Sequence, residues 1–145
     1  MGGIIMRKTA DVSKLVRLAE SYYPKKKFYH AMRVATYAFD KASSSKNVKP
    51  LDAFAVGMAH DLLEDTECTP EELSKIMEPE LVGAVLELTK GDDESYDKYI
   101  MHIIEKGSDL AMLVKGADMK DHIMQEETLT DKLWRKYQPY LKYFL

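Results

Sequence analysis

The spacing of the apolar residues is the feature that most constrains how this chain can fold. Apolar side chains recur at steps of three and four, as in Val12, Leu15, Val16 and Ala19, which is the period of an amphipathic helix. No stretch of useful length alternates apolar and polar residues in the manner of a strand. The sequence therefore predicts an all-α fold, a compact bundle of about six to eight helices.

Prolines and capping residues set the expected limits of these helices. We expect the first three at about 9–22, 28–39 and 50–65, with the lysine run 25–27 as a loop between the first two. The motif Thr69-Pro70-Glu71-Glu72 is typical of a capping box that begins a short helix. Further helices are predicted at about 81–88, 96–105 and 109–118, and from 130 to 137 and beyond, with a bend at Pro139.

Composition narrows the class of protein. The 145 residues are 46% hydrophobic, an ordinary size for one domain, so we expect a single domain over 1–145. Lys and Arg number 21 against 24 Asp and Glu, which argues against a general nucleic-acid or membrane-surface binder. The single cysteine, Cys68, argues against an internal disulfide and favours the cytoplasm. Residues 1–8 have too short an apolar run for a signal peptide or membrane span. The sequence does not decide whether the protein forms a homo-oligomer.

The doublet His60-Asp61 is the strongest chemical signal. Glu64 and Asp65 follow it at a spacing of four, so on one continuous helix each lies a turn beyond a residue of the doublet. Adjacent helical residues point about 100° apart, so one ion can contact both only if other helices supply further ligands.

His30 and Asp118 are the partners that the pattern favours, because each is a polar residue on an otherwise apolar, core-facing helix. Two imidazoles and two carboxylates suit a divalent ion such as manganese, iron or zinc. Such an ion would polarise a phosphorus centre and acidify water. A carboxylate one turn beyond the ligands can take the proton of that water, so we expect Glu64 to be the general base and Asp65 to orient the water.

These residues resemble a known family. His30, the His60-Asp61 doublet and Asp118 are similar to the ordered metal-binding set of the HD superfamily of phosphohydrolases. The fuller pattern, His60-Asp61-x-x-Glu64-Asp65-Thr66, resembles the hydrolase domain of the RelA/SpoT family, which removes the 3′-pyrophosphate from guanosine tetra- and pentaphosphate. Corresponding segments occur at 69–73, 88–90 and 113–118, so the resemblance runs from about His30 to His122.

The resemblance implies a helical domain that holds manganese, with Glu64 and Asp65 positioning and deprotonating the attacking water. The RelA/SpoT enzymes carry a synthetase domain after the hydrolase domain, and 145 residues are too few to include one. The chain is therefore similar to the small stand-alone alarmone hydrolases. The function predicted is a metal-dependent phosphohydrolase of nucleotides that cleaves a 3′-pyrophosphate.

The substrate side departs from the family pattern. Lys25, Lys26 and Lys27 lie just before His30 and are expected to bind the pyrophosphate. After the aspartate the family usually has Arg and, three residues later, Asn, whereas this chain has Met119 and His122. His122 is a candidate for substrate contact or for packing. The alternatives are an HD-type 5′-nucleotidase or nucleotide pyrophosphatase, and an HD domain that binds a nucleotide or a protein without turnover.

Overall fold

The computed structural model describes residues 9–145, and the predicted all-α fold is confirmed there. The one β contact in this part of the chain is an isolated bridge between Ala10 and Met77. Six helices have nine or more residues: α1 (Val12–Tyr22), α2 (Lys25–Ala42), α3 (Pro50–Ala59), α6 (Pro79–Glu87), α7 (Tyr96–Lys106) and α8 (Asp109–Met124). The shorter ones are α4 (Leu62–Asp65), α5 (Pro70–Ser74), α9 (Asp131–Tyr137), the 3-10 turn η1 (Gln138–Tyr140) and α10 (Leu141–Phe144). Residues 1–8, which we compared with signal peptides, lie outside the described part.

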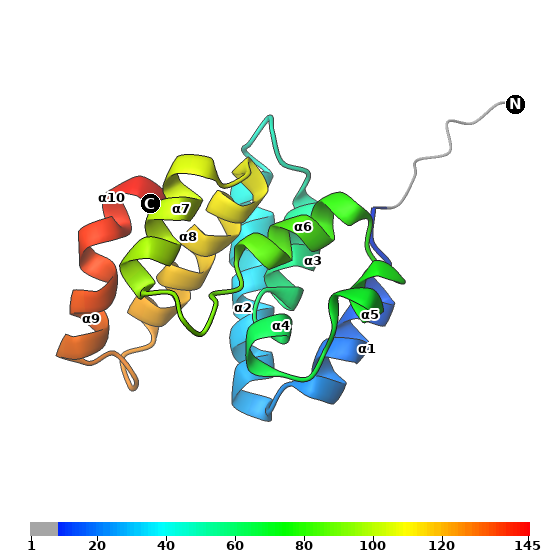
Figure 1. Ribbon diagram of the computed structural model, residues 1–145, viewed down its shortest axis with the longest axis horizontal. Coiled ribbons are helices and arrows are strands. Elements are labelled where there is room, and N and C mark those ends of the chain that lie inside the picture. Colours follow the sequence, from blue (N-terminus) through cyan, green and yellow to red (C-terminus); the bar gives the residue numbers. More distant parts are fainter. Residues whose placement is uncertain (1–8) are drawn as a thin grey trace, which may run out of the picture.

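Helices α2, α3 and α8 form the centre of the molecule, and the others surround them (Figure 1). Helices α1 and α6 pack on α3, and α7 and α10 pack on α8. Gly57 lets α2 and α3 come close, because a Cβ at this position would lie 2.7 Å from Ala35 Cα. The core contains fully buried side chains from five of these helices: Leu15, Val34, Met58, Ile100 and Val114.

Side-chain caps explain where several of the helices begin. The hydroxyl of Thr69 accepts from Glu72 N–H and the Glu72 carboxylate accepts from Thr69 N–H, so the predicted capping box is present. The hydroxyls of Ser95, Ser108 and Thr130 cap α7, α8 and α9 by each accepting from one backbone N–H of the first turn, and each cap is worth about 0.5–2 kcal/mol. None of the helices formed by residues 9–145 has the length and apolar character that a membrane span requires.

The lysine run is helical, which corrects the predicted loop. Pro24 is extended, and its carbonyl accepts from Phe28 N–H at 2.9 Å, so the helical hydrogen bonds begin there. Lys25, Lys26 and Lys27 are therefore the first turn of α2. A proline fits this place because it has no N–H to leave unsatisfied.

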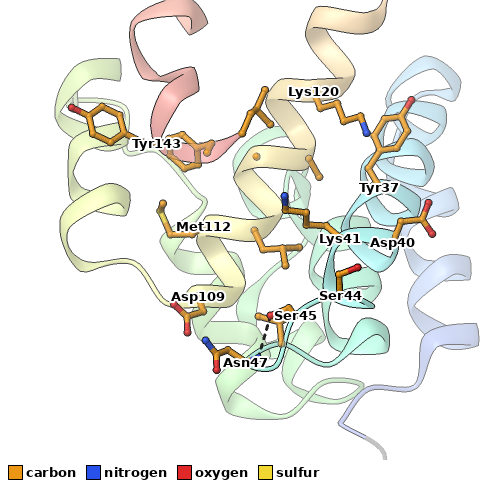
Figure 2. A pocket seen from close by; sticks show the side chains of 16 residues that line it. Tyr37, Asp40, Lys41, Ser44, Ser45, Asn47, Asp109, Met112, Lys120 and Tyr143 are labelled. Atoms are coloured by element: carbon orange, nitrogen blue, oxygen red, sulfur yellow. Dashed lines mark hydrogen bonds between the residues drawn. The ribbon is translucent and has the colours of Figure 1, made fainter.

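Two hollows lie on opposite faces of α8. The larger, about 960 Å³, is bounded by α2, the loop that follows it, α8 and the last residues of the chain (Figure 2). The smaller, about 740 Å³, contains His30, Asp61 and Asp118, and we call it the His–Asp cleft. The chemically distinctive residues thus lie in the smaller hollow.

Candidate metal centre

A break between α3 and α4 positions His60 and Asp61. The sequence predicted one helix from Pro50 to about Asp65, but α3 ends at Ala59 and α4 begins at Leu62. The Tyr23 hydroxyl donates to Met58 O at 3.0 Å and accepts from Asp61 N–H at 3.2 Å, which takes both groups out of the helical ladder. The predicted continuous helix from Pro50 to about Asp65 is therefore interrupted at His60 and Asp61, although Asp65 N–H still donates to Asp61 O at 2.9 Å, one helical turn earlier.

The orientation of His60 is fixed by the carbonyl that the break leaves free. His60 Nδ1 lies 2.6 Å from Gly57 O, and because a carbonyl can only accept, Nδ1 carries the hydrogen. Nε2 consequently faces the carboxylates of Asp61 and Asp118. This atom is buried and has no hydrogen-bond partner of acceptable geometry, although it lies 3.2 Å from Asp61 Oδ2 and 3.4 Å from Asp118 Oδ1.

His30 is oriented by a second carboxylate. Its Nδ1 donates to Asp121 Oδ2 at 2.6 Å, and Arg33 holds Asp121 through Nε, 2.7 Å from Oδ1, and Nη2, 3.1 Å from Oδ2. His30 Nε2 then lies 2.9 Å from Asp118 Oδ1. A ring whose outer nitrogen donates to a carboxylate is the arrangement that fixes histidine ligands in metal sites.

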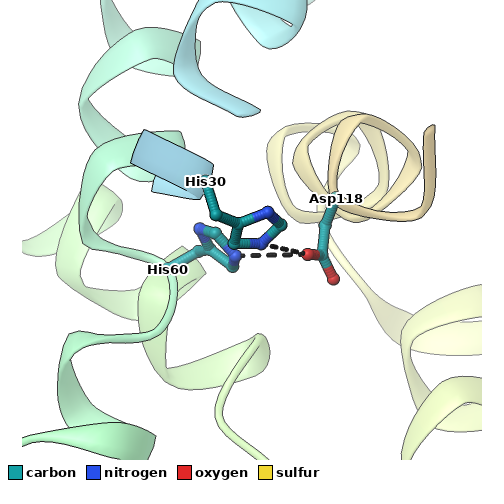
Figure 3. Close-up of side chains that lie close together, drawn as sticks. All are labelled: His30, His60 and Asp118. Atoms are coloured by element: carbon teal, nitrogen blue, oxygen red, sulfur yellow. Dashed lines mark hydrogen bonds and ion pairs between the residues drawn. The ribbon is translucent and has the colours of Figure 1, made fainter. Parts of the chain in front are cut away.

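Four side chains from three segments of the chain converge at this point, and we call them the His–Asp cluster: His30, His60, Asp61 and Asp118. Ligand atoms of His30, His60 and Asp118 all lie within 4.8 Å of one another. Asp61 Oδ2 adjoins them, 3.9 Å from His30 Nε2. Both imidazoles point toward the same oxygen of Asp118 (Figure 3). A group of two histidines and an aspartate at this spacing can hold a metal ion.

The imidazoles and carboxylates of the cluster shift one another's pKa values. Burial lowers the pKa of His60, but the Asp61 and Asp118 carboxylates raise it well above its ordinary value. Burial raises the pKa of Asp118, but Lys115 and the three nearby imidazoles lower it well below its ordinary value. The pKa of Asp61 falls to about 2 despite burial, chiefly because of His60. A cation would replace the imidazole protons.

Glu64 and Asp65 line the cleft beside the cluster. Lys90 N–H donates to Glu64 Oε1 at 2.7 Å. Partial desolvation raises the pKa of Glu64, the Lys90 hydrogen bond opposes this, and the Asp61 and Asp65 carboxylates raise it further. Asp65 forms an ion pair with Lys27. Glu64 is thus a carboxylate whose second oxygen is free to accept.

The expected substrate contacts lie in different surroundings. Lys26 and Lys27 line the cleft, whereas Lys25 is not among its lining residues and places Nζ 5.8 Å from the Tyr29 ring centroid. His122 also lines the cleft. Its Nε2 lies 3.2 Å from Asp118 Oδ1, and its ring stacks on Tyr137 with the centroids 5.3 Å apart.

Several cleft residues were missing from the sequence prediction. Asp121 and Arg33 follow Asp118 and His30 by three residues, a helical spacing that could have indicated them. Lys115 is 7% exposed, and its Nζ lies 2.9 Å from Asp118 Oδ2. The wall formed by Tyr96, Lys136 and Tyr137 had no sequence signal, because α7 and α9 are brought together only by tertiary packing.

Comparisons with known proteins agree with this geometry. The chain is 32% identical over 82 residues to the guanosine-3′,5′-bis(diphosphate) 3′-pyrophosphohydrolase MESH1 of Drosophila melanogaster, a match that covers 53% of this chain and 45% of that protein. The chain therefore matches less than half of the length of this relative. No protein-family model matches it.

A solved structure described as a metazoan ortholog of SpoT that hydrolyzes ppGpp and plays a role in starvation responses has the same fold. Its TM-score is 0.73, with 20% identity over 97% of this chain and 86% of that one. The resemblance predicted from the sequence is confirmed by the relation to MESH1, and the structural match shows a shared fold.

Proposed function

We propose that this relative of a guanosine-3′,5′-bis(diphosphate) 3′-pyrophosphohydrolase is itself a metal-dependent phosphohydrolase of nucleotides. The observation that carries the proposal is the convergence of two imidazoles and an aspartate, of which His30 and Asp118 line the 740 Å³ cleft. The substrate we propose is guanosine-3′,5′-bis(diphosphate), cleaved at its 3′-pyrophosphate.

The residues present fit a metal ion. His60 Nε2 is buried, lacks a hydrogen-bond partner and belongs to a ring whose other nitrogen is engaged by Gly57 O, so its lone pair is directed at the cluster. Leaving such an atom unpaired costs about 1–3 kcal/mol, which a bound ion would offset. We propose His30, His60, Asp61 and Asp118 as ligands and Mn²⁺ as the ion, with Fe²⁺ or Zn²⁺ as alternatives. When bound, such an ion supplies Lewis acidity toward water and a phosphoryl oxygen.

Glu64 is the proposed general base. Its Oε1 is held by Lys90 N–H, so Oε2 remains to accept the proton of the attacking water. Its raised pKa brings the carboxylate nearer to the range in which a base can both take and release a proton at neutral pH. Asp65, paired with Lys27, would orient the same water. The water oxygen bonds to phosphorus, the bond from phosphorus to the 3′-oxygen breaks, and the products are GDP and pyrophosphate.

Positive charge at the start of α2 would bind the pyrophosphate. Lys26 and Lys27 line the cleft, and Lys25 lies beside them in the same helical turn. Each ammonium can form charge-assisted hydrogen bonds with phosphate oxygens. His122, which faces the cleft next to Asp118, is a further proposed contact.

A second candidate is a 5′-nucleotidase or nucleotide pyrophosphatase that uses the same centre. Met119 occupies the place where the family usually has Arg, and Met119 is 0% exposed. Its side chain is therefore in the core and is not available to a nucleoside. A substrate whose nucleobase is not guanine is therefore compatible with this site.

The test is a product assay in which the metal is varied. Protein stripped with a chelator and reloaded with Mn²⁺, Fe²⁺ or Zn²⁺ is incubated with several nucleotides, and the products are separated. Pyrophosphate and GDP from guanosine-3′,5′-bis(diphosphate) support the proposal, whereas orthophosphate and a nucleoside support the second candidate. Tight binding without turnover would indicate a non-catalytic domain. In the same assay, His30→Ala removes a proposed metal ligand. Its matched control is His102→Ala, because His102 is an exposed histidine that does not line the cleft.

A further inference from the structure

Tyr96, the first residue of α7, has a hydroxyl without a partner. Among residues 9–145, the buried side-chain polar atoms that lack a hydrogen-bond partner are Tyr96 Oη and His60 Nε2, and both residues adjoin the His–Asp cleft. Burial raises the pKa of Tyr96 to about 12, so this hydroxyl is a donor at neutral pH. An unpaired buried hydroxyl costs about 1–3 kcal/mol. The Tyr96 hydroxyl is therefore a donor without an acceptor, on a residue that lines the cleft.

Lys136, on α9, places an ammonium over the ring of Tyr96. Its Nζ lies 4.5 Å from the Tyr96 ring centroid and 5.5 Å from the Tyr137 ring centroid. No ion pair within the described part of the chain involves Lys136. Partial burial and the nearby Lys115 lower its pKa. Lys136 is thus a cation that lines the cleft and has aromatic neighbours but no carboxylate partner.

Lys115 adds positive potential behind these two residues. Its buried Nζ lies 5.7 Å from the Tyr96 ring centroid, although its charge is paired with Asp118 Oδ2 at 2.9 Å. The wall formed by α7 and α9 therefore combines a hydroxyl donor with an unpaired ammonium. Phosphate oxygens are the acceptors that such a pair binds best, because the hydrogen bonds are charge-assisted.

We propose that Tyr96 and Lys136 form a phosphate-binding subsite that holds a phosphate group of the substrate other than the one that is cleaved. This rests on the proposed function, in which Lys26 and Lys27 on α2 bind the pyrophosphate that leaves. The start of α2, which carries Lys26 and Lys27, and helix α9, which carries Lys136, lie apart in the fold (Figure 1), so we assign the two sets of cations to different phosphate groups of the substrate. The substrate class is a nucleotide that carries phosphate groups at two positions of its ribose.

The test compares two substrates that differ only in the distal phosphates, guanosine-3′,5′-bis(diphosphate) and guanosine 3′-diphosphate. The wild-type protein should have the lower KM for the first. In Lys136→Gln and Tyr96→Phe this preference should shrink about tenfold or more through KM, with kcat for the first substrate retained, since a hydrogen bond to a charged group is worth about 1.5–3 kcal/mol. Lys132→Gln, an exposed lysine on the same helix that does not line the cleft, should keep the preference. Equal losses for both substrates, or none, would overturn the proposal.

A binding experiment separates failure of the subsite from failure of the proposed function. Inorganic pyrophosphate is titrated calorimetrically into metal-free protein, which needs no turnover. Lys136→Gln should bind pyrophosphate about tenfold more weakly, or with one binding event fewer, than wild type and Lys132→Gln. If wild type hydrolyses no nucleotide but this difference is found, the function is wrong and the subsite stands. If pyrophosphate binds the Lys136→Gln protein as it binds wild type, the subsite is wrong.

Discussion

Replacing Asp118 with Asn should destabilise the metal-free protein strongly. Asp118 is 5% exposed, and its Oδ2 lies 2.9 Å from the ammonium of Lys115, which is 7% exposed. Removing the carboxylate charge leaves that ammonium buried and uncompensated. Breaking a buried ion pair in this manner costs about 3–5 kcal/mol. The substitution also removes the oxygen charge toward which three imidazoles are directed, so the protein should lose its metal and its activity together.

Urea denaturation in the presence of a chelator measures the free energy of unfolding without the metal. For an m-value of about 1–3 kcal/mol per molar urea, the midpoint should fall by about 1 M or more. Lys115→Met combined with Asp118→Asn is the matched control, because methionine fills similar volume without a charge. The double variant should recover most of the lost stability. A single variant as stable as wild type, or a double variant no more stable than the single one, would refute the reasoning.

The remaining predictions concern the same cleft. Glu64→Gln should retain the metal and lose about 10²–10⁴-fold in turnover, and an unchanged rate would remove Glu64 as the base. Asp121→Asn should weaken Mn²⁺ binding about 10–100-fold in equilibrium dialysis, because His30 loses the carboxylate that orients it; unchanged affinity would show that Asp121 is dispensable. Metal affinity should fall on acidification. Although burial lowers the pKa values of His30 and His60, the neighbouring carboxylates raise them above the ordinary value, so protons compete with the ion as pH falls through the raised values. A metal affinity that does not change between pH 9 and pH 6 would contradict this competition.

The helical fold was predictable because the apolar spacing is a local property of each segment. The break between α3 and α4 was not, because it depends on the hydroxyl of Tyr23, whose partner Asp61 is 38 residues along the chain. Nothing between Pro50 and Asp65 indicates that a side chain from elsewhere interrupts the helical hydrogen bonds. The lysine run was predicted to be a loop because it follows Pro24 and the apolar stripe of the next helix begins only at Phe28.

The sequence indicated the proposed metal ligands of the candidate site better than it indicated the residues that orient them. His30 and Asp118 stood out because polar residues on apolar helix faces need a reason to be there. The partners that orient them, Asp121, Arg33 and Lys115, occur among many charged residues and are identified only by their contacts. Tyr137 is buried and also lines the cleft, and no pattern in the sequence indicated this second role.

The central claim is that His30, His60, Asp61 and Asp118 bind one divalent ion. Anomalous diffraction from crystals soaked in Mn²⁺ tests this claim most directly, because it locates the ion independently of activity. The account predicts one strong peak in contact with both Nε2 atoms and with oxygens of both aspartates. A peak elsewhere, or none at this cluster at saturating Mn²⁺, would contradict it.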